Sequence, residues 1–239
     1  MFFVARMLPF PCLITTTTKV GFDQITAADL CLSYSDFVAN PGKLAGKKVI
    51  WVSPTLSPEH RKVTGFIPIL FSRFSLYAAS MNLPVVIEAD GAHERHIKSP
   101  ADHEPAIPPE TTMMLHLTGL DVLDKPVSDR HVHRVERFME ITGAAEDDVL
   151  CEELIVKNIL HPQGGFKNAP GGCRCIAVLT HADTPERVTR GMNIAGELVA
   201  SGQVDCVWLT RLFPIQDRFV TVIRSTGSEH FIFDAEDEG

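Results

Sequence analysis

Residues 85–108 read VVIEADGAHERHIKSPADHEPAIP, and they join an apolar run to a dense group of ionisable side chains. The apolar run stops at Glu88 and Asp90, and a glycine follows. Short runs rich in Val and Ile and bounded by turn residues are typical of strands buried on both faces of a parallel sheet. Because ligands bind outside the carboxyl ends of the strands in an open parallel sheet, this segment predicts a strand and a candidate site where the strand ends.

The same kind of apolar run recurs six more times along the chain. These runs cover residues 12–17, 48–52, 112–120, 175–180, 205–210 and 219–224. Helical patterns lie between many of them, at residues 57–80, 129–142, 146–160 and 184–201. In the last of these, Thr184 is placed to cap the helix and Pro185 to begin it.

This alternation predicts an α/β fold, with a mostly parallel sheet and helices on both faces. We expect a single α/β domain over residues 1–239, with an acidic tail at about 234–239.

Composition narrows the class of partner. The net charge is −8 and the pI is about 5.7, without a basic stripe, so we expect no nucleic-acid partner. No apolar run approaches the ~18 residues of a membrane span, and the apolar N-terminal stretch has no signal cleavage site, so we expect no membrane partner. Six scattered cysteines favour the reducing cytoplasm, and Cys173 and Cys175 lack a second pair at zinc-ligand spacing.

The end of the apolar run at residues 84–89 predicts a cation site. A carboxylate at the end of a buried strand needs a neutralising charge, and a hydrated Mg²⁺ at Asp90 supplies one. Gly91 would let a backbone N–H approach a phosphate closely. The alternative is that Asp90 only begins a turn.

Two other strand ends carry polar groups. The sequence TTTTK at residues 15–19 either forms a plain edge strand or places the hydroxyls of Thr17 and Thr18 on a phosphate or Mg²⁺. In THAD, residues 180–183, Asp183 either accepts hydrogen bonds from a guanine edge or helps Thr184 to cap the following helix.

The same segment is also compatible with a different class of protein, a metal-dependent hydrolase. His93, His96 and His103 lie close in sequence, with carboxylates between them. Their spacing does not place them on one face of a helix, so the sequence gives no fixed geometry for a metal.

Taken together, the order of these segments resembles the YqeC family. The resemblance covers roughly residues 10–210 and rests on TTTTK (15–19), EADGAHERHIKSPADHEPAIP (88–108), GLDVLDKP (119–126), VHRVERF (132–138), HPQGGFKNAP (161–170) and VLTHAD (178–183). Members of this family are described as accessory factors for selenium-dependent molybdenum hydroxylases, under the heading of selenium cofactor biosynthesis. The expected partners are therefore such a hydroxylase or its cofactor-assembly proteins.

The resemblance also implies a P-loop-NTPase-like fold that binds Mg²⁺ and a nucleoside triphosphate, ATP or GTP. Asp90 would take the Mg²⁺ side, Thr17 and Thr18 would lie beside the phosphates with Gly91, and Asp183 would read the base. Further site candidates without an assigned step are Glu88, Lys98, His103 and Glu104. The resemblance assigns no catalytic residue.

Two departures qualify the resemblance. The family begins with a strand and a Gly-rich G-K-[ST] loop well before TTTTK, whereas Thr15 is preceded here by fourteen residues. The segment PGKLAGKKV, residues 41–49, has the wrong glycine spacing and no Ser or Thr after Lys47. His181 also stands where a base-recognition motif would have Lys, which weakens a preference for guanine.

We therefore expect the first strand and the P-loop to be missing, and without them phosphate loses its cradle of backbone N–H groups. Either the chain is incomplete, or the protein has lost the loop and is a non-catalytic binding or scaffold protein. An exposed sheet edge would then favour self-association.

Overall fold

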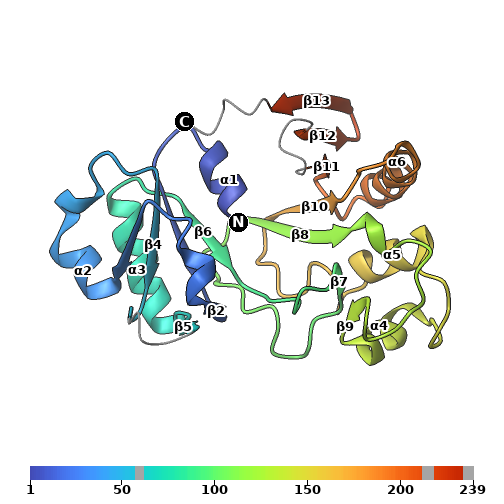
Figure 1. Ribbon diagram of the computed structural model, residues 1–239, viewed down its shortest axis with the longest axis horizontal. Helices are drawn as coiled ribbons and strands as arrows, with labels where there is room; N and C mark the ends of the chain where they lie inside the picture. The colour runs from blue at the N-terminus through green and yellow to red at the C-terminus, as the bar shows by residue number, and fades with distance from the viewer. Residues whose placement is uncertain (57–61, 212–217, 234–239) are drawn as a thin grey trace. The chain divides into compact units, whose positions relative to one another are not determined.

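A computed structural model describes residues 1–56, 62–211 and 218–233. The chain forms two compact units, Met1–Gly91 with Ala106–Glu110 (the first unit) and Ala92–Pro105 with Thr111–Gly239 (the second unit). Each unit has its own sheet and is described by itself (Figure 1). The single domain expected over residues 1–239 stays a prediction.

The first unit is built on a four-stranded parallel sheet of order β3-β4-β1-β6. Its strands are β1 (Cys12–Thr16), β3 (Leu30–Ser33), β4 (Val49–Ser53) and β6 (Val85–Glu88), with a small antiparallel pair β2 (Lys19–Gly21) and β5 (Lys62–Thr64). Its helices are α1 (Phe2–Met7), α2 (Tyr34–Ala39) and α3 (Pro68–Ser80), with short 3-10 turns η1 (Phe22–Ile25) and η2 (Pro41–Leu44).

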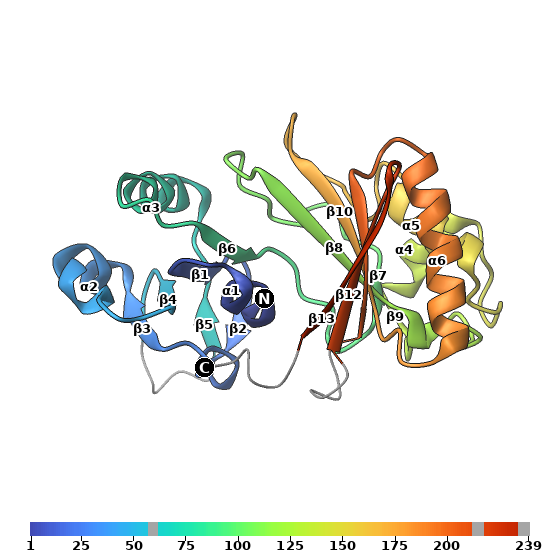
Figure 2. The same cartoon turned by 90° about the horizontal axis from the view of Figure 1, so that it is seen from above.

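Both faces of this sheet are covered. Successive residues of β1 point to opposite faces, so Leu13 packs with α2 and α3, while Ile14 packs with α1 and η1. A cluster of aromatic rings closes the first face, where Phe66 stacks on Phe74 with ring centroids 4.8 Å apart. The two views in Figures 1 and 2 show α2 and α3 on one side of the strands and α1 on the other. The predicted α/β architecture with a parallel sheet between helices is confirmed here.

The second unit contains a five-stranded mixed sheet of order β13-β12-β11-β10-β8. Its strands are β8 (Met113–Gly119), β10 (Arg174–Thr180), β11 (Cys206–Arg211), β12 (Arg218–Arg224) and β13 (Gly227–Phe233), with a separate parallel pair β7 (Ile97–Lys98) and β9 (Val132–His133). Its helices are α4 (Val135–Thr142), α5 (Glu152–Leu160) and α6 (Pro185–Ala200), with a 3-10 turn η3 (Leu120–Val122).

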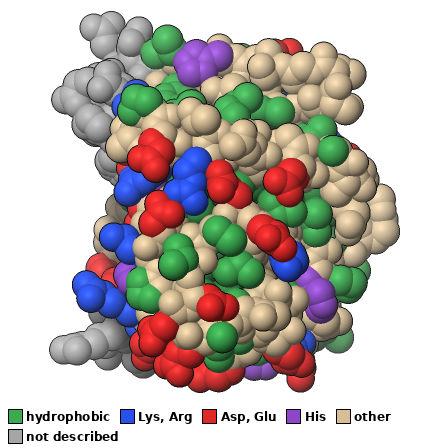
Figure 3. Space-filling view, turned by 90° about the vertical axis from the view of Figure 1, so that its right-hand side faces the viewer, with side chains coloured by type: hydrophobic (Ala, Val, Ile, Leu, Met, Phe, Trp, Pro, Cys, Tyr) green, Lys and Arg blue, Asp and Glu red, His purple; other side chains and the backbone are tan. Residues whose placement is uncertain are grey.

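Strands β8, β10 and β11 are parallel, and β12 and β13 continue the sheet as an antiparallel hairpin. Helices α4, α5 and α6 lie along one face of the sheet (Figure 2). Figure 3 shows that acidic, basic and apolar side chains are interspersed on the face it presents. Thr184 caps α6 by accepting a hydrogen bond from Arg187 N at 3.2 Å, as the sequence predicts.

Strands form at all seven predicted runs, but they divide between two sheets. Two predicted helices begin later than expected. Arg134 adopts a left-handed conformation (φ 65°), so α4 begins at Val135 instead of residue 129. Val149 bridges Pro126, which delays α5 until Glu152. In the region predicted helical at 57–80, the helix is α3, a strand occupies Lys62–Thr64, and residues 57–61 lie outside the described residues.

No helix within the described parts of the chain has both the length and the apolar character needed to cross a bilayer. All six cysteines are free thiols, and Cys173 and Cys175 are half-buried around the start of β10.

Candidate functional site

The first unit brings two of the predicted site segments to one edge of its sheet. Strands β1 and β6 are parallel neighbours, and Thr16 is the register partner of Glu88. Thr17 N donates to the Glu88 carbonyl at 3.0 Å, and Thr16 Oγ1 donates to the same oxygen at 2.9 Å. The segments containing Thr17 and Asp90 therefore leave the sheet side by side, at its carboxyl end.

The threonine hydroxyls form a hydrogen-bonded turn beyond β1. Thr16 Oγ1 accepts from Thr18 N at 2.9 Å and lies 3.0 Å from Thr18 Oγ1. Thr17 Oγ1 donates to the Ala106 carbonyl at 2.9 Å. A hydroxyl oxygen that donates one hydrogen bond keeps lone pairs for a cation or a donor, so these contacts fix the turn without using up its oxygens.

Gly65 holds this turn from outside. A Cβ at Gly65 would lie 2.5 Å from the carbonyl carbon of Thr17 and 2.6 Å from Thr18 N, so only glycine fits. Gly91 differs, because a Cβ there would meet no heavy atom within 4 Å. Internal packing thus explains the glycine at position 65 but not the one at position 91.

The acidic side of this edge has the chemistry of a hard-cation site. Burial raises the pKa of Glu88, the positively charged N-terminus opposes this effect, and the nearby charge of Asp90 raises the pKa further. Carboxylate and hydroxyl oxygens are the donors that Mg²⁺ takes in proteins. Thr15 Oγ1, near the end of the neighbouring strand β1, is buried without a hydrogen-bond partner among the described residues. The residues present therefore fit a magnesium ion, which would lower the cost of placing Glu88 and Asp90 together.

In the second unit, Lys98 and Glu104 belong to an internal ion-pair network. Lys98 Nζ lies 2.9 Å from Glu104 Oε2, and Arg134 Nη2 lies 2.7 Å from Glu104 Oε1. Burial alone raises the pKa of Glu104, but hydrogen bonds from Arg134 and Lys98 outweigh it and hold the pKa at about 2. This geometry gives both predicted site candidates a structural role. His103 is largely exposed, with its Nε2 3.8 Å from Glu104.

The residues around Glu104 are clamped by the loop after α5. Lys167 is buried, and its Nζ donates to the carbonyls of Ala101 at 2.7 Å and Asp102 at 3.1 Å. Asn168 Nδ2 donates to the Pro105 carbonyl at 3.0 Å. Asn158 Nδ2, from α5 itself, donates to the Lys98 carbonyl at 3.0 Å. The loop HPQGGFKNAP therefore positions residues 101–105, and Asn158 of α5 holds the backbone at Lys98.

Asp183 lies in the second unit, between His181 and α6. Its Oδ2 is 3.4 Å from Arg187 Nη1 and 3.5 Å from His181 Nδ1. Thr17, Thr18 and Asp90 belong to the first unit, and the predicted reading of a base by Asp183 stays a prediction.

The histidines of residues 93–103 separate into different surroundings. His93 stacks on His133 with ring centroids 4.8 Å apart, and His103 faces solvent beside Glu104. His96 instead joins Asp121 and His181, which sequence reasoning did not include in a metal site. The three histidines of this segment do not form a metal-ligand group among the described residues.

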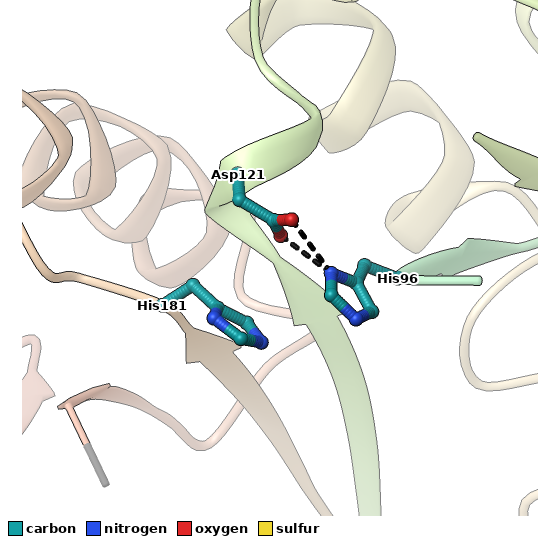
Figure 4. Close-up of side chains that lie close together, drawn as sticks. All are labelled: His96, Asp121 and His181. Atoms are coloured by element: carbon teal, nitrogen blue, oxygen red, sulfur yellow. Dashed lines mark hydrogen bonds and ion pairs between the residues drawn. The ribbon is translucent and has the colours of Figure 1, made fainter. Parts of the chain in front are cut away.

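His96, Asp121 and His181 lie at the carboxyl end of the second sheet. Gly119 of β8 is the register partner of Thr180 of β10, so Asp121 and His181 follow neighbouring strand ends. His96 Nδ1 is 2.7 and 2.8 Å from the two Asp121 oxygens, and its ring stacks on His181 with centroids 4.5 Å apart (Figure 4). The signal that could have found this group is the position of Asp121 and His181 just after two apolar runs.

Comparison with known proteins places the chain in a family. The model of a family described as YqeC protein matches residues 1–136, which is more than half of the 239 residues. The chain belongs to the YqeC family. This YqeC-family chain is 34% identical over 125 residues to the uncharacterized protein YqeC of Escherichia coli (strain K12).

That alignment covers 52% of this chain and 48% of the relative, so the chain matches about half the length of the curated relative. The family match contains Thr17, Asp90, His96 and Asp121, whereas His181 lies beyond it. No solved structure matches this YqeC-family chain.

Proposed function

We propose that this chain binds a magnesium–nucleoside triphosphate, ATP or GTP, at the carboxyl edge of the first unit's sheet. We propose further that it acts in the cytoplasm as an accessory protein in the maturation of selenium- and molybdenum-dependent hydroxylases. Its partners in that role are such a hydroxylase or its cofactor-assembly proteins. Both the client class and the nucleotide rest on the family resemblance, and the geometry of the sheet edge supports the nucleotide.

The observation that carries the nucleotide proposal is the register of Thr16 with Glu88. It sets the Thr17–Thr18 turn beside the segment of Asp90 at the sheet edge where parallel folds bind ligands. In this assignment Asp90 holds Mg²⁺ and the hydroxyls of Thr17 and Thr18 face phosphate oxygens. The open space around Gly91 admits a phosphate close to the backbone.

We propose nucleotide binding at this edge and assign no hydrolysis to it. Residues 41–49 do not provide a phosphate loop, because Pro41–Leu44 form a 3-10 turn and a strand begins at Val49 where a helix would be needed. The bound magnesium ion would supply positive charge to the phosphates. The chain's own contribution is to orient the nucleotide through its threonine turn and to hold the ion through its carboxylates.

Calorimetric titration of the full chain with Mg-ATP and Mg-GTP tests this assignment. Asp90→Asn keeps the side-chain size and removes the charge, so we expect a loss of about tenfold or more in affinity in the presence of Mg²⁺. Asp23→Asn is the matched control, because Asp23 is exposed in the same unit. This variant should bind Mg-ATP and Mg-GTP with the same affinity as the native chain. Unchanged affinity in Asp90→Asn would refute the role of Asp90, and no binding of either nucleotide would favour the scaffold alternative.

A further inference from the structure

We infer that His96, Asp121 and His181 form a binding site for a divalent first-row transition-metal ion, separate from the magnesium proposed for the first unit. One ligand atom from each of the three residues lies within 4.8 Å of the other two. Figure 4 shows Asp121 above His96 and the His181 ring beside them. The site belongs entirely to the second unit and does not depend on nucleotide binding.

The distances allow an ion to be enclosed by side-chain rotation alone. Ligand atoms that each lie about 2.1 Å from a tetrahedral ion are about 3.4 Å apart. His96 Nδ1 and Asp121 are already closer than this, at 2.7 Å. The rings of His96 and His181 are nearly parallel, with 17° between their planes. Binding turns one ring so that a nitrogen of each faces the ion.

The backbone around the three side chains is fixed independently of any ion. Gly119 N donates to the His96 carbonyl at 2.7 Å, and a Cβ at Gly119 would lie 2.6 Å from the His96 Cβ. Ala182 N donates to the Thr210 carbonyl at 3.1 Å, which anchors the residue after His181. The ligand residues are therefore held by the sheet, as a preorganised site requires.

His181 is in a conformation that L-residues seldom adopt. Its φ of 60° lies in the left-handed region, which is unfavourable for a residue other than glycine. Such residues cluster at ligand sites, where the surrounding structure maintains them. This conformation places the His181 ring against His96 and next to Asp121.

The donor set selects the class of metal. Two imidazoles and one carboxylate suit Zn²⁺, Fe²⁺, Co²⁺ or Ni²⁺, whereas Mg²⁺ and Ca²⁺ prefer an all-oxygen shell. Three protein ligands leave at least one coordination position open for water or a small ligand. The partial exposure of all three residues gives an ion access from solvent.

Asp183 supplies the supporting contact that metal-bound histidines usually have. Its Oδ2 lies 3.5 Å from His181 Nδ1, and Arg187 Nη1 lies 3.4 Å from the same carboxylate oxygen. A carboxylate on one ring nitrogen orients the ring and leaves the other nitrogen for the metal. The role of Asp183 in this site is that of a positioning residue.

Titration of the metal-free full chain with Zn²⁺ and Co²⁺ tests the inference. We expect one high-affinity ion per chain and visible Co²⁺ absorption without a thiolate band. His181→Ala and Asp121→Asn should each weaken Zn²⁺ binding at least as much as the loss of an outer-shell partner does, by about 10–100-fold or more. The control is His161→Ala, since His161 is exposed in the same unit and outside the group. It should bind as the native chain does.

Far-UV circular dichroism of the metal-free variants shows whether weaker binding comes from loss of a ligand or from loss of the fold. Asp121→Asn changes the side-chain shape very little, so it tests the site even if His181→Ala does not fold. Absence of stoichiometric binding by the native chain would overturn the inference. So would a Co²⁺–thiolate band, which would place the ion on cysteines, or unchanged affinity in Asp121→Asn.

Discussion

Glu104 and Arg134 form a two-point ion pair: Arg134 Nη2 donates to Oε1 at 2.7 Å, and Arg134 Nε donates to Oε2 at 3.1 Å. Lys98, which is buried, adds a third contact to the same carboxylate at 2.9 Å. One carboxylate thus neutralises two cations from separate segments of the second unit. Its removal leaves both cations without this counter-charge.

Glu104→Gln should lower the free energy of unfolding by about 2–4 kcal/mol. Removing one partner of a hydrogen-bonded ion pair leaves the other charges poorly solvated and without compensation, which destabilises the folded state by more than the intact pair stabilises it. Urea denaturation at neutral pH measures the difference. Glu146→Gln is the control, since Glu146 is exposed in a loop of the same unit, and it should change stability by less than about 0.5 kcal/mol. Equal stabilities of the two variants would contradict the network.

The same carboxylate makes stability depend on pH within a definite window. The folded pKa of Glu104 is about 2, below its ordinary value of 4.5, so the unfolded chain binds more protons between these values. The contribution of Glu104 is therefore fully present above about pH 4.5 and is lost as pH falls toward 2. The stability difference between the native chain and Glu104→Gln should shrink on acidification through this range. A difference that stays constant in urea titrations from about pH 5 to pH 3 would show that Glu104 is not the linked group.

His133 reports the charges of the same network. Burial and the positive charges of Lys98 and Arg134 lower its pKa to about 4, while Glu104 opposes this effect. In Glu104→Gln the pKa of His133 should fall further, because the remaining cations act without the carboxylate. An NMR titration of the His133 ring in both proteins measures the change. A higher pKa in the variant would reverse the predicted sign.

The strands could be predicted from sequence where their signal is local. Runs such as residues 48–52 and 175–180 are apolar on both faces, and strands formed there. Strand β3 was missed because Leu30–Ser33 is short and only partly buried, and it is defined by its pairing with β4. Strand β13 was missed because much of it is polar and exposed, and among the described residues it pairs with β12 alone.

The candidate sites likewise have one part that could be predicted from sequence and another that could not. The sequence indicates that Thr17 and Asp90 each follow a strand of a parallel sheet. The structure adds the register of β1 with β6, which places their segments side by side. Asp121 and His181 could be placed after two apolar runs, but the position of His96 beside them could not be predicted. It depends on the pairing of β8 with β10 and on a loop that returns His96 to Gly119. The contact between Glu104 and Arg134 spans thirty residues, and no pattern in either segment indicates it.

Gly65→Ala should destabilise the first unit by about 1–3 kcal/mol, because its methyl group would press on the backbone between Thr17 and Thr18, which cannot rotate away as a side chain can. That backbone is fixed further by Phe66 N, which donates to the Thr16 carbonyl at 2.9 Å. Gly42→Ala provides the comparison, since an added methyl there meets no heavy atom within 4 Å.

Thermal and urea unfolding of both variants measure the effect, and Gly42→Ala should lose no more than about 0.5 kcal/mol. Because Thr17 and Thr18 are the proposed phosphate contacts, Gly65→Ala should also bind Mg-ATP or Mg-GTP more weakly than Gly42→Ala at a temperature where both are folded. If Gly65→Ala proves as stable as Gly42→Ala, the close approach of Gly65 to the threonine turn is wrong. If it is destabilised but binds nucleotide normally, the turn is structural and the phosphates lie elsewhere.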